Sequence, residues 1–208
     1  MDMSVETTIY TVGHSNHSIE RFLSILQAAE VTAIADVRSQ PFSRYNPQFN
    51  RGALREVLRA HGIAYAFVGK ELGARPGDPG CYERGQVQYG RLAATVLFKA
   101  GLDRVMAASH KYRIALMCAE KEPLVCHRTL LVGQALKGRG VNLVHILANG
   151  DIEPDDDAMR RLLDMTGVPR LDLFRTPDEL LQEAMARQMQ GLTYSDDKQT
   201  GDINGDVE

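Results

Sequence analysis

Short apolar runs alternate with helical apolar stripes along most of the chain. Between the runs, apolar residues recur at helical spacing, as in Ile19, Phe22, Leu23 and Leu26. Strands that alternate with helices favour a mostly parallel sheet with helices on both faces. The sequence therefore predicts a single-domain α/β fold with about five strands. The apolar runs that we take as strands are 7–12, 31–37, 63–68, 113–117 and 141–147.

Capping residues mark the expected ends of the helices. Ser18 and Asn50 precede two of them, and Thr176 with Glu179 forms a capping box for the last. Gly101 interrupts one long helical stretch. The predicted helices cover residues 18–29, 50–61, 91–110, 123–136, 154–165 and 176–190.

The domain is expected to span residues 1–190, with a helical C-terminal extension at 151–190. Residues 191–208 are polar and acidic and predict a disordered tail. Residues 74–90 are rich in glycine, proline and charge, which predicts a long loop or lid.

Composition narrows the class of protein. The chain of 208 residues has a formal net charge of -3, so no global charge favours nucleic acid. It has three cysteines, no signal peptide and no apolar run of about 18 residues, the length of a membrane span. We therefore expect a cytoplasmic protein with reduced thiols and no contact with a membrane. The basic residues lack an interleaved aromatic stripe for stacking on single strands.

Polar residues follow the predicted strands at the point where each strand ends. Because the carboxyl ends of parallel strands meet at one edge of a sheet, these side chains should line one crevice. In chain order they are His14, Ser15, Asp36, Arg38, Glu71, Cys118 and Glu120.

Cys118 is the candidate nucleophile. It is expected where a strand ends and a helix begins, and amide donors at a helix N-terminus lower a thiol pKa. The alternative is that Cys118 is a small buried apolar residue. A zinc site from Cys118, Glu120, Cys126 and His127 is disfavoured, since adjacent Cys126 and His127 would point apart on a helix. We expect neither a metal nor a cofactor.

Three arginines are candidate anion ligands. Arg38 follows a strand end, Arg44 lies in a proline-rich loop, and Arg128 lies in the first turns of a helix, where a cation needs an anion to explain it. Asp36 would orient Arg38 or act as a general base. The rival interpretation is a structural ion-pair network without a ligand.

Proton transfer has two candidate residues. His14 has the reach of an acid or base, or else is hydrogen-bonded to its loop backbone. Glu120 is a base beside Cys118 or the salt-bridge partner of an arginine. The remaining predicted substrate-binding residues are Ser15, Ser43, Glu71, Cys126 and His127.

Five quoted motifs resemble a known family. TVGHS at 11–15, DVRSQPFSR at 36–44, KELG at 70–73, CAEKEPLVCHR at 118–128 and HI at 145–146 are similar to the bacterial family called domain of unknown function 488, over roughly residues 7–150. The resemblance implies a single α/β domain, generally soluble and cytoplasmic, with no settled activity. Carried onto this chain, the motif positions are His14, Ser15, Asp36, Arg38, Pro41, Ser43, Arg44, Glu71, Cys118, Glu120, Cys126, His127 and Arg128.

A weaker likeness is to rhodanese-type sulfurtransferases, which also have Asp-Val-Arg after one strand and a cysteine at the end of a later strand. The segment AEKEPLV after Cys118 is longer and more acidic than the rhodanese loop. A cysteine phosphatase would have an arginine at position 124, where this chain has Leu124.

These residues predict a small enzyme that uses cysteine thiol chemistry on a small anionic substrate, phosphate-like or nucleotide-like. Cys118 would attack, the arginines would hold the anion, and Glu120 or His14 would move protons. The alternative is a noncatalytic module that binds a nucleotide or a nucleic-acid end through the same arginines. The sequence does not indicate an oligomeric state.

Overall fold

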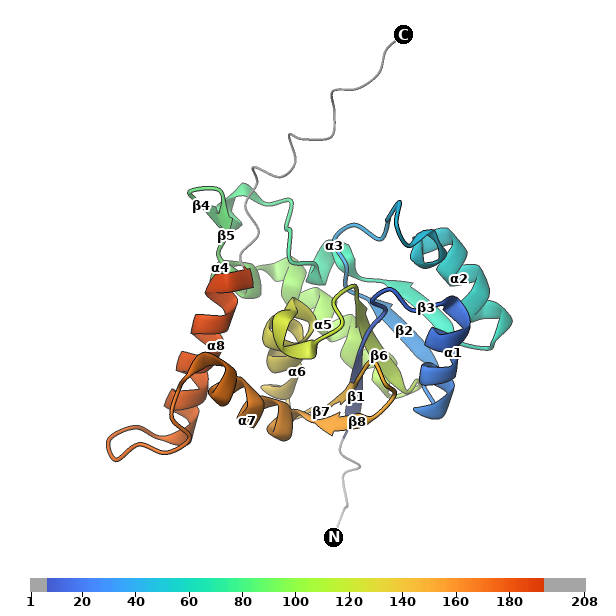
Figure 1. Cartoon of the computed structure of the whole chain (residues 1–208). Coiled ribbons are helices and arrows are strands. Elements are labelled where there is room, and N and C mark those ends of the chain that lie inside the picture. The colour runs from blue at the N-terminus through green and yellow to red at the C-terminus, as the bar shows by residue number, and fades with distance from the viewer. Residues whose placement is uncertain (1–6, 193–208) are drawn as a thin grey trace.

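The computed structural model describes residues 7–192 and confirms the predicted α/β class. Its main sheet has six strands (Figure 1). In spatial order they are β3 (Ala64–Phe67), β2 (Ala33–Asp36), β6 (Ile114–Cys118), β1 (Thr8–Gly13), β7 (Asn142–Ile146) and β8 (Ile152–Pro154). The predicted acidic tail lies outside the described residues, except for its first two residues, which belong to the last helix.

The five predicted strands all form and pair in parallel. The sixth strand, β8, was not predicted and pairs antiparallel with β7, Ile152 opposite Ile146. It was missed because three residues ending in Pro154 are too few to show an alternating pattern.

Helices cover both faces of this sheet. α1 (Ile19–Ala28) and α2 (Arg51–Ala60) lie on one face, and α5 (Val96–Ser109) and α6 (Gln134–Lys137) lie on the other (Figure 1). Successive residues of β6 alternate between the two cores: Ala115 and Met117 face α1 and α2, and Cys118 belongs to the core beneath α5. This alternation places the Cys118 side chain on the α5 side of the sheet.

The predicted helix at 91–110 is two helices, α4 (Tyr89–Ala94) and α5. They divide at Thr95, whose hydroxyl accepts a hydrogen bond from the Phe98 N–H at 3.1 Å and caps α5. The predicted break at Gly101 was wrong. Gly101 lies inside α5, where its missing side chain lets α3 (Gly69–Leu72) approach, since a Cβ there would lie 2.8 Å from Leu72.

The segment predicted as a loop or lid at 74–90 contains local structure. A 3₁₀ turn (Pro79–Cys81) leads into a hairpin of β4 (Tyr82–Glu83) and β5 (Gln86–Val87). The two residues of its turn, Arg84 and Gly85, both have positive φ, as two-residue hairpin turns require. Buried Cys81 and Val87 anchor the hairpin in the core.

The C-terminal extension forms a smaller core of its own. α7 (Asp155–Thr166) and α8 (Pro177–Leu192) pack together, on the α6 side of the molecule in Figure 1. Leu162 and Leu180 meet Leu124 and Leu130 from the segment after β6. Within residues 7–192, the helices are all too short or too polar to cross a bilayer.

Candidate functional site

A cavity of about 240 Å³ opens at the carboxyl ends of β2 and β6. Four predicted site residues, Arg38, Cys118, Glu120 and His127, line it. The other lining residues are Ser39, Gln40, Phe42, Ala74, Arg75 and Ala119. Three of the seven residues that were predicted at strand ends, Arg38, Cys118 and Glu120, therefore line one cavity.

The residues at the end of β1 hold the chain that follows Cys118 at the edge of the cavity. The His14 and Ser15 N–H groups donate to the carbonyls of Cys118 and Ala119, both at 2.9 Å, which extends the parallel pairing beyond the strands. Gly13 permits this approach, because a Cβ there would lie 1.9 Å from the Glu120 carbonyl oxygen. Close contact between two backbones is thus what holds the chain after Cys118 in place.

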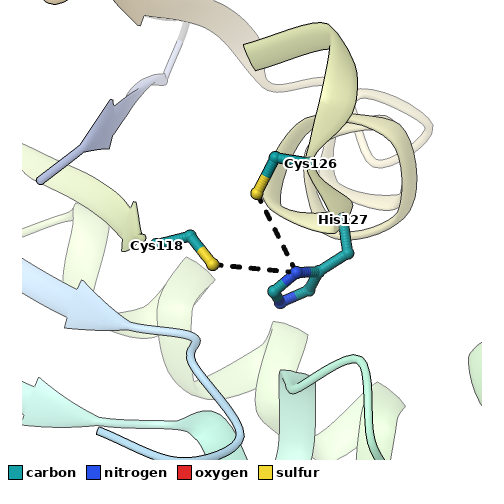
Figure 2. A group of neighbouring side chains, drawn as sticks. All are labelled: Cys118, Cys126 and His127. Carbon is teal, nitrogen blue, oxygen red and sulfur yellow. Dashed lines mark hydrogen bonds between the residues drawn. The ribbon is translucent and has the colours of Figure 1, made fainter. Parts of the chain in front are cut away.

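Cys118, Cys126 and His127 form a compact buried cluster. Figure 2 shows both sulfurs facing the imidazole ring, with Cys118 coming from the end of β6. His127 Nδ1 lies 3.8 Å from Cys118 Sγ and 3.9 Å from Cys126 Sγ. The argument that Cys126 and His127 point apart on a helix was wrong. Cys126 has an extended backbone, with φ −138° and ψ 137°, and the π-helical turn begins only at Arg128 (Arg128–Gly133).

A second contact orients the His127 ring. Its Nε2 lies 3.1 Å from the Val37 carbonyl oxygen, which can only accept, so Nε2 carries a proton and donates it. The other nitrogen, Nδ1, is therefore the one presented to the sulfurs. A carbonyl that fixes the orientation of a histidine in this way is typical of both catalytic and metal-binding histidines.

The two thiols differ in acidity, in the opposite sense to the prediction. Burial raises the pKa of Cys118 well above its usual value, and neighbouring Cys126 and Glu120 add to the effect. Burial also opposes ionisation of Cys126, but the Cys118 hydrogen bond, the Arg128 charge and His127 outweigh it and bring the Cys126 pKa well below its usual value. The helix expected to begin directly after Cys118 begins only at Arg128, ten residues later in the chain.

Glu120 and His127 complete the charge distribution. Glu120 Oε2 accepts a hydrogen bond from the Cys126 thiol at 2.9 Å. Burial lowers the His127 pKa, but the negative charges of Cys126 and Glu120 outweigh burial and raise it. The cluster thus places the acidic groups of Cys126 and Glu120 beside the His127 imidazole.

Arg38 lines the cavity and is held by a buried hydrogen-bond network. The Asp36 carboxylate accepts hydrogen bonds from Arg38 Nε at 2.9 Å and from Arg38 Nη2 at 2.7 Å. The Phe49 carbonyl accepts a further hydrogen bond from Arg38 Nη2 at 2.9 Å. Tyr65 also donates to Asp36, at 2.7 Å. Asp36 is fully buried, and its carboxylate accepts from Arg38 and Tyr65, which favours the orienting role over general-base chemistry.

His14 is part of the same network. Its Nδ1 donates to the Ser15 carbonyl at 2.8 Å, and its Nε2 accepts from Arg38 Nη1 at 3.1 Å. Burial and the Arg38 charge lower the His14 pKa to about 4, and the ring stacks on Phe49. His14 is therefore a neutral, backbone-bound histidine, which was the alternative to the acid or base role.

Arg128 does not reach the cavity. Its side chain has 0% exposure, and its guanidinium donates to the Glu120 carbonyl at 2.7 Å and the Lys121 carbonyl at 3.4 Å. Its expected role as a crevice-facing anion ligand was wrong, because the turn that carries Arg128 is itself buried. Arg128 instead holds the chain after Cys118 and places a positive charge near Cys126.

The other predicted substrate ligands lie around the cavity. Glu71 pairs with Arg104 of α5. Ser43 organises its own loop, since its hydroxyl accepts the Tyr45 and Asn46 N–H groups. Ser15 lines a neighbouring pocket that also includes Lys121 and Asn149, and Arg44 is exposed. Among the described residues, Glu71, Ser43 and Ser15 make their hydrogen bonds and ion pairs outside the cysteine cluster.

Sequence reasoning missed several residues that build the site. Arg75, with Ser39 and Gln40, lines both the cavity and an adjoining one of about 380 Å³. Arg75 belongs to the segment 74–90, whose length suggested a functional role. That length was the sequence signal that could have identified Arg75. Phe49 and Tyr65 support His14 and Asp36 through contacts that sequence spacing does not reveal.

The comparisons with known proteins identified a family but no individual relative. A search of curated proteins and a search of solved structures each returned no match. The likeness to rhodanese-type sulfurtransferases therefore gains no support. The family model described as domain of unknown function DUF488 matches residues 18–135, more than half of the chain and including the whole cysteine cluster. The motifs at 11–15 and 145–146 lie outside the match. The chain belongs to the DUF488 family.

Proposed function

We propose that this protein is a cytoplasmic enzyme that uses cysteine thiol chemistry on a small anionic substrate. The observation that carries the proposal is the position of Cys118 and His127 on the wall of the cavity, with the Cys126 sulfur directly behind them. A nucleophile, a base and an orienting partner within reach of one another are the minimum for nucleophilic catalysis.

The roles follow from the contacts. Cys118 is the thiol that a substrate reaches, so its sulfur forms the bond to the electrophilic atom. As that bond forms, the Cys118 proton passes to the neighbouring Cys126 sulfur, and the Cys126 thiol gives its own proton to Glu120 Oε2, 2.9 Å away. The leaving group departs with its bonding electron pair, and His127 next to Cys118 stabilises the negative charge that develops.

The anion is held by the arginines of the wall. Within the described residues, four of the five N–H groups of Arg38 have partners, which leaves one Nη1 donor for a ligand. Arg75 lines the same cavity and its neighbour, so a phosphate-bearing or sulfate-like group between them would have two cations nearby. The shared lining gives room for a larger, nucleotide-like substrate.

Alkylation tests the proposal. Metal-free reduced protein is treated with iodoacetamide between pH 6 and 8, and the modified cysteines are mapped by mass spectrometry. Cys118 should react in spite of its raised pKa, because Cys126 and Glu120 take up its proton as the sulfur attacks, and inorganic phosphate should slow the reaction by occupying the cavity. Cys81, buried elsewhere in the core, is the internal control and should stay unmodified. An unreactive Cys118 would leave only the noncatalytic binding module.

A further inference from the structure

The Cys118, Cys126 and His127 cluster has a second chemistry available to it. The three donor atoms, two sulfurs and His127 Nδ1, all lie within 4.8 Å of one another, and all three side chains are buried. Two soft thiolates and one imidazole are the donor set that zinc and other thiophilic divalent ions prefer.

The spacing fits a tetrahedral ion. With Zn–S near 2.3 Å and Zn–N near 2.1 Å, sulfur and nitrogen ligands lie about 3.6 Å apart. The observed distances from His127 Nδ1 are 3.8 Å to Cys118 Sγ and 3.9 Å to Cys126 Sγ. Both distances are within a few tenths of an ångström of that spacing, and the two sulfurs lie no more than 4.8 Å apart.

The surroundings also suit a metal. His127 donates its Nε2 proton to the Val37 carbonyl at 3.1 Å, which leaves Nδ1 unprotonated for coordination. The Arg128 N–H lies 3.4 Å from Cys126 Sγ, where it can donate to a bound thiolate. Such second contacts orient the ligands of metal sites and strengthen them.

We propose that reduced Cys118, Cys126 and His127 bind a thiophilic divalent ion of the zinc class, with the fourth coordination position open to the cavity. Cys118, His127 and Glu120 line that cavity, so water or an anionic ligand atom can reach the open position. Three protein ligands and one open position are the pattern of catalytic rather than structural zinc. Glu120 lies outside this set of three donors and lines the same cavity.

This site goes beyond the proposed thiol enzyme and does not depend on it. Both cysteines bind as thiolates and release their protons, so a bound ion occupies the sulfur that would otherwise attack a substrate. The metal-bound and nucleophilic states of the cluster therefore exclude each other.

Titration with Co²⁺ followed by Zn²⁺ tests the site in the full-length, reduced, EDTA-treated protein. Co²⁺ should bind once per chain and show thiolate charge-transfer absorption with the strong visible bands of a tetrahedral ion. Zn²⁺ should displace it one for one and raise the melting temperature. Absence of this absorption, or binding without a defined stoichiometry, would overturn the proposal.

Matched variants identify the ligands. Cys118→Ala, Cys126→Ala and His127→Gln should each weaken Co²⁺ binding by more than about 100-fold. Cys81→Ala removes a buried thiol outside the cluster and should bind one ion like the wild type. Glu120→Gln should also retain one ion. Charge-transfer absorption that persists in both Cys118→Ala and Cys126→Ala would place the ion elsewhere.

A protection experiment keeps the test decisive if a variant fails to fold. Zn²⁺ should block iodoacetamide at Cys118 and Cys126 of the wild type, and EDTA should restore the reaction. One-for-one metal binding with no labelling in EDTA would reject only the thiol enzyme. Labelling in EDTA that Zn²⁺ does not affect would reject only the metal site.

Discussion

Two buried arginines show what residue type alone can and cannot predict about this site. Arg38 and Arg128 were both expected at the crevice because neither position suits an ordinary surface cation. Arg38 does line the cavity, with Asp36 fixing its orientation, whereas Arg128 turns inward to backbone carbonyls. The sequence identified two unusual cations but could not say which way each side chain turns, because tertiary packing decides that.

The cysteine cluster was found from sequence, but its geometry was not. Cys126 was placed on a helix because Pro123 and the following leucines predict one. In the structure, Cys126 remains extended and both it and His127 reach the sulfur of Cys118. Proline starts only a short 3₁₀ turn here, Pro123–Val125, and no local rule signals the extended residue that follows it.

His14 gives the stability a defined dependence on pH. Its pKa is about 4 in the folded protein and near 6.5 when unfolded, so the unfolded state binds more protons between these values. The contribution is complete above about pH 6.5 and is lost as pH falls toward 4. The free energy of unfolding from urea titrations should drop by about 2–3 kcal/mol from this group over that window.

His14→Gln isolates the effect. Glutamine can still accept from Arg38 but cannot titrate, so the difference between the two pH profiles belongs to His14. Between pH 6.5 and 4 the wild type should therefore lose about 2–3 kcal/mol more unfolding free energy than the variant. Parallel profiles from pH 6.5 to 4 would show that His14 is not held neutral in the folded state.

At the scale of elements, the spacing of apolar residues predicted the strands and helices that pack to form the sheet and its two faces. The parallel strands and α1, α2 and α7 follow from apolar runs and stripes, and all of them form. The division at Thr95 and the added strand β8 were missed, because a hydroxyl cap inside a helical stretch and a three-residue edge strand leave little periodic signal.

Gly13 joins the end of β1 to the chain after β6, and its substitution tests that contact. Gly13→Ala would place a Cβ 1.9 Å from the Glu120 carbonyl oxygen, so one backbone must move. We expect a loss of about 3 kcal/mol or more in the free energy of unfolding, the range for overpacking against an interior that cannot yield. The measurement is urea denaturation followed by circular dichroism.

Gly52→Ala is the matched control for this substitution. Gly52 lies in the first turn of α2, and a Cβ there has no neighbour within 4 Å. Alanine should therefore stabilise the protein by up to about 1 kcal/mol through helix propensity. Equal effects of the two substitutions would mean that the contact of Gly13 with Glu120 does not hold the site together.

At the scale of the whole molecule, the C-terminal extension packs against the segment that leads to Cys126. Leu124, in the turn just before Cys126, packs in the same core as Leu162 and Leu180. Arg161 of α7 adds an ion pair to Glu122 at 2.9 Å. The sequence showed the extension as helices but not what they cover, since contacts between distant segments have no local pattern. α7 and α8 are therefore part of what positions the cysteine segment.

This link makes Leu180 a remote determinant of the cysteine cluster. Leu180→Ala removes a side chain that is 1% exposed and should cost about 2–4 kcal/mol of unfolding free energy. Because the cavity it leaves borders Leu124, the chain from Ala119 to Cys126 should loosen. Alkylation of Cys118 and Cys126 by iodoacetamide should then proceed faster in the variant while it is still folded.

Leu171→Ala is the control, because Leu171 is 86% exposed in the loop between α7 and α8. Its unfolding free energy should change by less than about 0.5 kcal/mol, with alkylation at the wild-type rate. The comparison separates stability from support of the site. If Leu180→Ala were destabilised but alkylated no faster than Leu171→Ala, the extension would stabilise the domain without positioning the cysteines.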